Sequence, residues 1–255
     1  MTKSFVSLNR RDVILGLAAG SIIPLSGCST ANAPMLLSDA DIQRMSDEAW
    51  SDAMAQERVL RDPRYQRRLD RVGRRMVDAS GQTHLNWEFV VLDNDAVNAW
   101  VLPNGKVAFY KGILDEMSND GHVAAVMGHE MGHVSARHAQ QRANQQRTAQ
   151  IGMQIVNVAL QSQGVERSQD ISAILGAGVQ YGVILPYSRQ HEYEADQLGV
   201  DYMVASGYQA NDAIDLWLAM SALHERSTLD FMSTHPSDDN RIAAMRAHIA
   251  ARGYA

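Results

Sequence analysis

Helical spacing of apolar residues dominates the first part of the folded chain. Apolar positions recur every three or four residues over residues 39–60 and again over residues 65–79, which is the period of an amphipathic α-helix. Asp62-Pro63 separates the two segments, because the residue before a proline disfavours helical backbone. Gly81 is typical of a helix end. We therefore expect two amphipathic helices before the pattern changes.

The pattern then takes on the character of β-strands. Residues 87–92 are rich in β-branched and aromatic side chains, which favour strands. Residues 98–102 and 106–110 flank Pro103-Asn104-Gly105, and Asn-Gly between two such runs is a strong hairpin signal. We expect a small antiparallel sheet in this part of the chain.

Helical spacing returns after the strands. Asn119 or Asp120 is a suitable N-cap for a helix that continues to about Arg142. Later helices are expected from Ser188, over residues 211–224 and over residues 238–251. Strands that are grouped apart from helices indicate an α+β fold, here a predominantly helical one.

The first residues have the pattern of an export signal rather than of a folded element. Lys3, Arg10 and Arg11 precede a short apolar run over residues 13–23. This run is shorter than a helical bilayer span requires, and its position after positive charges is typical of a signal peptide. The paired arginines leave twin-arginine and ordinary secretory export both open.

Leu25-Ser26-Gly27-Cys28 follows this run and looks like a bacterial lipobox, in which the cysteine becomes the lipidated first residue. Ser29 is not the aspartate associated with retention at the inner membrane, so we expect a lipid anchor on the periplasmic side of the outer membrane of a Gram-negative bacterium. The expected organisation is a signal peptide over residues 1–27, a lipidated tether over residues 28–37 and one folded domain over residues 38–255.

Composition narrows the classes of function. Apolar residues make up 45% of the 255 residues, which is enough to bury a core. The net charge of −6 and the absence of a basic stripe argue against a nucleic-acid partner. Cys28 is the only cysteine, so the chain forms no internal disulfide. Loss of the signal peptide makes the chain more acidic, so acyl chains at Cys28 must hold it to a membrane.

The central motif is the HExxH sequence His129-Glu130-Met131-Gly132-His133. Positions i and i+4 share one face of a helix, so both imidazoles can bind one zinc ion. Glu130 lies off this face and is placed to act as general base on a zinc-activated water. Gly128 and Gly132 cost helix stability, which indicates that another segment approaches this helix closely.

A third ligand is expected in the segment Ser188 to Asp196. Glu192 and Asp196 are four residues apart and share a helix face, so one can bind metal while the other accepts a hydrogen bond from a ligand histidine. Glu194 points to another side. The spacing favours Glu192 over Glu194 as the third metal ligand but does not exclude Glu194.

Together the two motifs resemble the gluzincin zinc metallopeptidases that include the heat-shock protease HtpX and the CAAX-prenyl proteases. The resemblance covers roughly residues 38–251 and is closest to the small envelope lipoprotein branch, with LoiP as an example and BepA as a larger relative. It implies a compact metallopeptidase domain with one Zn²⁺ per chain and with the sheet beside the HExxH helix. It also implies that Glu192 is the third ligand and that Asp196 supports a ligand histidine.

The resemblance extends to the last part of the chain. His235 matches a histidine that either stabilises the oxyanion or, in a latent state, occupies the open zinc position. Arg241 matches an arginine that supports the same loop. The role of His138, which matches a common histidine of the family, stays open. An extended substrate is expected to add to a sheet edge formed by Lys106, Val107, Ala108, Phe109 and Tyr110.

The expected function is a zinc-dependent endopeptidase that hydrolyses misfolded or assembling envelope proteins as part of protein quality control. The expected partners are these polypeptides, the membrane through Cys28, and outer-membrane assembly machinery. One alternative is a chaperone-like assembly factor whose zinc site is closed by His235, and another is a metal-free structural lipoprotein. Residues 162–186 are the candidate gating segment.

Overall fold

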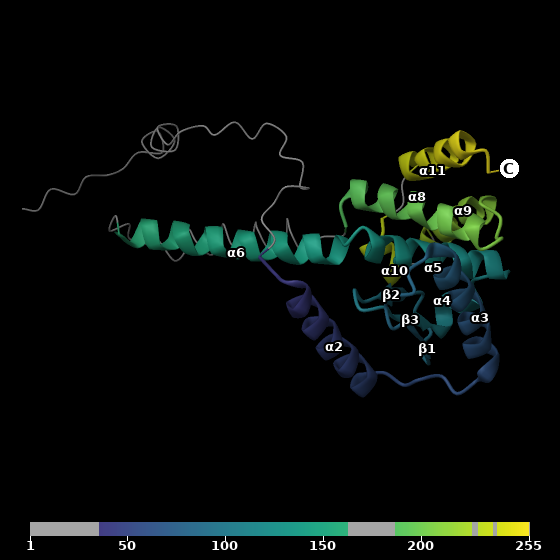
Figure 1. Cartoon of the computed structure of the whole chain (residues 1–255), viewed down its shortest axis with the longest axis horizontal. Coiled ribbons are helices and arrows are strands. Elements are labelled where there is room, and N and C mark those ends of the chain that lie inside the picture. Colours follow the sequence, from purple (N-terminus) through teal and green to yellow (C-terminus); the bar gives the residue numbers. More distant parts are fainter. Residues whose placement is uncertain (1–35, 163–186, 226–228, 237–238, 255) are drawn as a thin grey trace, which may run out of the picture. The chain divides into compact units, whose positions relative to one another are not determined.

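The computed structural model describes residues 36–162, 187–225, 229–236 and 239–254 (Figure 1). These residues belong to one compact unit, Met35–Ala255. The expected signal peptide, Cys28 and nearly all of the candidate gating segment lie outside the described residues. Among the described helices, none combines the length and the apolar character needed to cross a bilayer.

Helix α5 (Asp120–Ser135) is the central element of the fold. Every residue from Gly121 to His133 is buried, as expected of a helix that has neighbours all around it. The Asn119 side chain accepts a hydrogen bond from the backbone N–H of His122 at 2.8 Å and so caps the helix. Helices α3 (Pro63–Ser80), α8 (Arg189–Ala205) and α9 (Asn211–His224) pack against it (Figure 1).

Two glycines allow α5 and α8 to approach closely, as the sequence predicted. A methyl group added at Gly132 would lie 2.6 Å from the carbonyl oxygen of Ala195, and one at Gly128 would lie 2.8 Å from that of Gly199. Neither separation is possible for a real side chain, so alanine at either position would push the helices apart. The close approach holds the side chains of α5 and α8 in fixed register.

The sheet is mixed, not antiparallel as expected. Strand β2 (Ala99–Val101) pairs antiparallel with β3 (Lys106–Tyr110), which confirms the hairpin, and Gly105 in its turn has a φ of 85°. Strand β1 (Glu88–Leu92) pairs with β3 in parallel. The order is β1-β3-β2. In both figures the sheet and α8 lie on opposite sides of α5.

Strand β3 is the centre of this sheet, so the prediction that residues 106–110 form its edge is wrong. Val107, Ala108 and Phe109 are all buried in succession, and since successive side chains of a strand point to opposite faces, both faces of β3 are covered. Such an unbroken apolar run is the signature of a central strand. The outer side of β1 already bonds to other segments: Val91 accepts from Leu60, and the Gln66 side chain bonds Phe89 and Val91.

The helix expected to continue to Arg142 is interrupted. Helix α5 ends at Ser135, and α6 (His138–Ser162) begins three residues later. Arg137 between them has a φ of 58°, and among the described residues other than glycine no other φ is positive. Its side chain bonds Gln140 at 2.5 Å and pairs with Asp39. These contacts hold a backbone conformation that a periodicity analysis does not predict.

The remaining elements agree broadly with the periodicity. Ser188 caps α8 through the N–H of His191, as expected, whereas the first helix ends earlier than residue 60. A short helix that the pattern did not predict precedes His235. The bounds are α2 (Asp39–Gln56), α4 (Lys111–Asp115), α10 (Asp230–Thr234) and α11 (Asp239–Arg252).

Candidate metal centre

Helix α5 contributes the two histidines and the intervening glutamate of the HExxH motif. The Nε2 atoms of His129 and His133 lie 3.0 Å apart, because residues four apart stand one above the other on a helix. Both histidines and Glu130 are at most 2% exposed. The two imidazoles therefore face a single buried point, as the spacing predicted.

Helix α8 brings Glu192, and not Glu194, to this point. Oε2 of Glu192 lies 3.4 Å from His129 Nε2, and its Oε1 lies 3.4 Å from His133 Nε2. The side chain of Glu194 is 59% exposed and lies on another side of the helix. The close packing of α5 on α8 makes the distinction that spacing alone left open.

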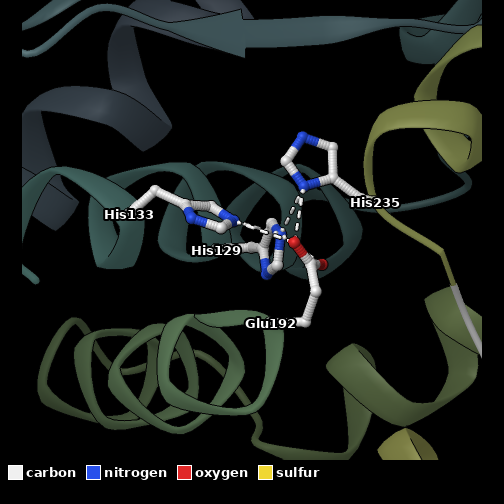
Figure 2. Close-up of side chains that lie close together, drawn as sticks. All are labelled: His129, His133, Glu192 and His235. Atoms are coloured by element: carbon white, nitrogen blue, oxygen red, sulfur yellow. Dashed lines mark hydrogen bonds and ion pairs between the residues drawn. The ribbon is translucent and has the colours of Figure 1, made fainter. Parts of the chain in front are cut away.

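His235 comes from the loop after α10 and meets the same point from the other side (Figure 2). Its Nδ1 lies 3.1 Å from His129 Nε2 and 3.3 Å from Glu192 Oε1. Its Nε2 lies 3.4 Å from Oε1 of Glu130. The Phe231 N–H donates to the carbonyl oxygen of Val97 at 3.1 Å, which anchors this loop next to β2.

Asp196 and Arg241 surround the cluster with a second set of contacts. Asp196 Oδ1 lies 2.9 Å from His129 Nδ1, and Arg241 donates to both oxygens of Asp196 at 2.5 and 2.8 Å. Nη1 of Arg241 also lies 2.8 Å from Oε2 of Glu192 and donates to the carbonyl oxygens of His235 and Pro236. Burial would raise the pKa of Asp196, but Arg241 outweighs it and lowers that pKa.

Several separations between the donor atoms are close to those of a tetrahedral metal site. Ligand atoms of His129, His133, Glu192 and His235 lie within 4.8 Å of one another. Zinc–nitrogen bonds of about 2.0–2.1 Å place the corners of a tetrahedron about 3.3–3.4 Å apart, and the separations given above run from 3.0 to 3.4 Å. Oε1 of Glu130 is also buried without a hydrogen bond among the described residues. These residues could therefore hold a metal ion.

The electrostatics suit cation binding. Burial would raise the pKa of Glu192, but His129 and His133 outweigh it and hold that pKa far below its usual range. Burial lowers the pKa of His133 well below its usual value. Burial and the Arg241 guanidinium would lower the pKa of His129, but the two carboxylates of α8 raise it to about 9. At this pKa His129 carries an extra proton at neutral pH, and a metal cation bound to its ring would replace that proton. Burial raises the pKa of Glu130.

The sequence did not predict two aromatic neighbours of the cluster, Tyr187 and Trp217, and it left the role of His138 open. The Tyr187 ring stacks on His133 at 4.1 Å between centroids, and the Trp217 ring lies 3.7 Å from the Arg241 guanidinium carbon. His138 is fully buried beside His133, and burial together with His191 lowers its pKa to about 4. No spacing pattern links these residues to the motif, since two come from other elements and the third follows the break at Arg137.

A cavity of about 530 Å³ lies beside His133 and reaches the sheet. Its lining includes Ile42, Leu85, Val101, Pro103, His133 and Tyr187. Strand β2 forms the free edge of the sheet at this point. The N–H of Tyr110 donates to the carbonyl oxygen of Asn98, and the N–H of Leu102 donates to that of Lys106. Residues that alternate with these hydrogen-bonded positions face the other way. The backbone groups of Ala99 and Val101 in β2 therefore point away from β3. An edge and a cavity thus meet next to the metal centre.

Comparison with known proteins places the chain in a family. Residues 63–249 match Peptidase family M48. Mitochondrial metalloendopeptidase OMA1 of Schizosaccharomyces pombe is 34% identical over 207 residues, which are 78% of this chain and 58% of that protein. Metalloprotease YcaL of Escherichia coli is 28% identical over 215 residues, 84% of this chain and 82% of that protein.

The Beta-barrel assembly-enhancing protease of Escherichia coli is 27% identical over 199 residues, which are 74% of this chain but only 39% of that protein. The chain thus spans little more than half of the yeast relative and well under half of this one. The family match covers most of the chain, including both motifs and every residue of the four-donor cluster. This chain belongs to peptidase family M48.

Proposed function

We propose that this chain is a zinc-dependent endopeptidase that hydrolyses peptide bonds of misfolded or assembling cell-envelope proteins. The observation that carries the proposal is the convergence of His129, His133 and Glu192 on one buried point beside an open sheet edge. Three of the relatives bear the names metalloendopeptidase, metalloprotease and protease, in agreement with this assignment.

Zinc is the metal that this donor set favours. Two imidazoles and one carboxylate are the protein ligands of many catalytic zinc sites, which leave a fourth position open. We therefore propose His129, His133 and Glu192 as ligands of one Zn²⁺ per chain. When bound, zinc would supply a Lewis acid that polarises a peptide carbonyl and acidifies a water molecule.

Glu130 is the proposed general base. Its Oε1 is buried and makes no hydrogen bond among the described residues, so it is available to accept a proton from water. Its nearest imidazole contact is His235 Nε2 at 3.4 Å. In this arrangement Glu130 takes a proton at Oε1 and returns it to the leaving amine, while Asp196 and Arg241 hold His129 and the His235 loop in place.

Strand β2, in place of β3, is the proposed binding edge for substrate. Ala99 and Val101 offer outward backbone groups, and neither makes a backbone hydrogen bond to another described segment. An extended peptide could pair with this edge by β-strand addition. A side chain of that peptide would then enter the cavity next to His133.

His235 raises a second candidate function. Because it lies within ligand distance of the same point, the four donors together could form a closed site of the structural type. In that state the chain would act as a chaperone-like assembly factor with a latent, self-blocked zinc site. In the open state His235 would instead face the substrate and stabilise the oxyanion.

The setting of this activity is also a proposal. A lipid anchor at Cys28 would place the domain at the periplasmic face of the outer membrane, where its partners would be unfolded envelope polypeptides and the outer-membrane assembly machinery. The name of the Beta-barrel assembly-enhancing protease agrees with such a setting. The chain's own pattern at residues 1–28 is the basis for the anchor.

Casein cleavage by four zinc-loaded proteins tests the proposal. Wild type should cleave casein, and Glu130→Gln should be about 10²- to 10⁴-fold slower because general-base catalysis is lost. His122→Ala removes a buried histidine of the same helix that lies outside the cluster, and it should retain activity. His235→Ala should be faster than wild type if His235 closes the site and slower if it stabilises the oxyanion.

Inactivity of both wild type and His235→Ala, with zinc bound, would contradict the peptidase proposal. The chaperone-like assembly factor would then be the remaining candidate. Full activity of Glu130→Gln would contradict the assignment of the base.

A further inference from the structure

The break between α5 and α6 brings a fourth buried histidine against a proposed ligand. On one continuous helix, His138 would lie about 140° around the axis from His133. The left-handed backbone of Arg137 turns the chain instead, and Nδ1 of His138 lies 2.9 Å from Nδ1 of His133. His138 is 0% exposed. The unusual backbone of Arg137 thus places the buried His138 ring against the proposed ligand His133.

The other ring nitrogen of His138 also has a partner. Its Nε2 lies 3.3 Å from Oε2 of Glu194, a carboxylate of α8 that the metal centre does not use. The His138 ring stacks on His191 at 4.2 Å between centroids. His133, His138 and Glu194 therefore form a line that runs from the buried centre to the surface.

Metal binding fixes the direction of every hydrogen bond in this line. His133 can bind a cation through Nε2 only if its proton is on Nδ1. That N–H must then donate to Nδ1 of His138, so the proton of neutral His138 is on Nε2. From there it donates to the Glu194 carboxylate. Metal binding at Nε2 of His133 thus determines the tautomers of both His133 and His138. The Glu194 carboxylate accepts the hydrogen bond from the Nε2–H of His138.

We propose that His138 is a positioning residue that fixes the tautomer and the ring orientation of His133 for metal binding. The proposal rests on the zinc site proposed above. Asp196 performs the same task for His129 directly, at 2.9 Å, whereas Glu194 acts on His133 through the His138 ring. Outer partners of this kind raise the basicity of a ligand and hold it in place.

The zinc affinity of four variants tests this role, with zinc measured by competition against a chelator at fixed pH. His138→Phe keeps the ring stack on His191 but removes the acceptor. His138→Gln places its amide where Nε2 was and so also removes the acceptor next to His133. His138→Asn keeps an oxygen acceptor in the place of Nδ1. His191→Phe is the matched control, because it alters the same stack but has no contact with His133.

His138→Phe and His138→Gln should bind zinc about 10- to 100-fold more weakly than wild type, while His138→Asn and His191→Phe stay within about threefold. The melting temperatures of the metal-free proteins should be similar, which separates metal positioning from folding. If His138→Phe does not fold, the Gln and Asn variants give the same comparison.

Wild-type affinity in His138→Gln, or an equal loss in His191→Phe, would overturn the role of His138 while leaving the zinc site intact. Absence of zinc binding in wild type would instead overturn the proposed function.

Discussion

Arg241 connects the elements that carry the cluster. It is 1% exposed, bonds Asp196 of α8 through two nitrogens, and holds the loop carbonyls of His235 and Pro236. Its guanidinium plane also lies over the Trp217 ring of α9. A planar fork with five donors suits these partners, and the point charge of a lysine does not. The side chain therefore balances two buried carboxylates and fixes one loop.

Replacement of Arg241 by methionine should destabilise the metal-free protein by about 3–5 kcal/mol, because Asp196 and Glu192 would lose the buried guanidinium that pairs with both of them. Urea unfolding at neutral pH measures the effect. The matched control is Arg252→Met, since Arg252 pairs with Asp201 but is 52% exposed, and it should cost about 0–1 kcal/mol. An equal loss of unfolding free energy in the two variants would show that Arg241 does not neutralise the buried carboxylates.

At this scale the sequence predicted the groups that follow from helical spacing and from the family pattern. His129, Glu130 and His133 share one turn, and Glu192 follows from the second motif. His138 could not be placed, because its position depends on the positive φ of Arg137. Such a conformation depends on contacts with Asp39 and Gln140 that no local pattern reveals.

The pairing of α5 with α8 is the structural basis of the site. Gly128 and Gly132 remove the side chains that would separate the helices, so His129 and Glu192 from different helices reach one point. The sequence indicated this contact, because glycines inside a helix are costly unless packing requires them. It did not indicate the order of the strands, which depends on the parallel pairing of β1 with β3.

Val101→Pro tests the proposed binding edge. The Val101 N–H points away from β3, so proline there removes a donor to substrate and keeps the β2–β3 pairing, as proline on an edge strand can. Loss of one hydrogen bond of about 0.5–1.5 kcal/mol should lower kcat/KM for a peptide about 2- to 10-fold. Val101→Ala keeps the N–H and is the control. Equal kcat/KM in the two variants would contradict binding along β2.

For the whole molecule, the helical α+β class followed from periodicity alone, because long amphipathic segments outnumber the strands. The mixed sheet and the central place of β3 were missed because the Asn-Gly turn reveals only the hairpin. The unbroken apolar run Val107-Ala108-Phe109 carried the information that β3 is covered on both faces. The outer contacts of the cluster, at Trp217 and Tyr187, arise only when distant elements pack together.

Elemental analysis of purified, dialysed protein tests directly whether the cluster binds zinc. We predict about one zinc ion per chain in wild type and in His122→Ala, and loss of that zinc in His133→Ala, since only His133 of this pair lies in the cluster. Wild-type protein that takes up no zinc, or a His133→Ala variant that retains a full equivalent, would contradict this prediction.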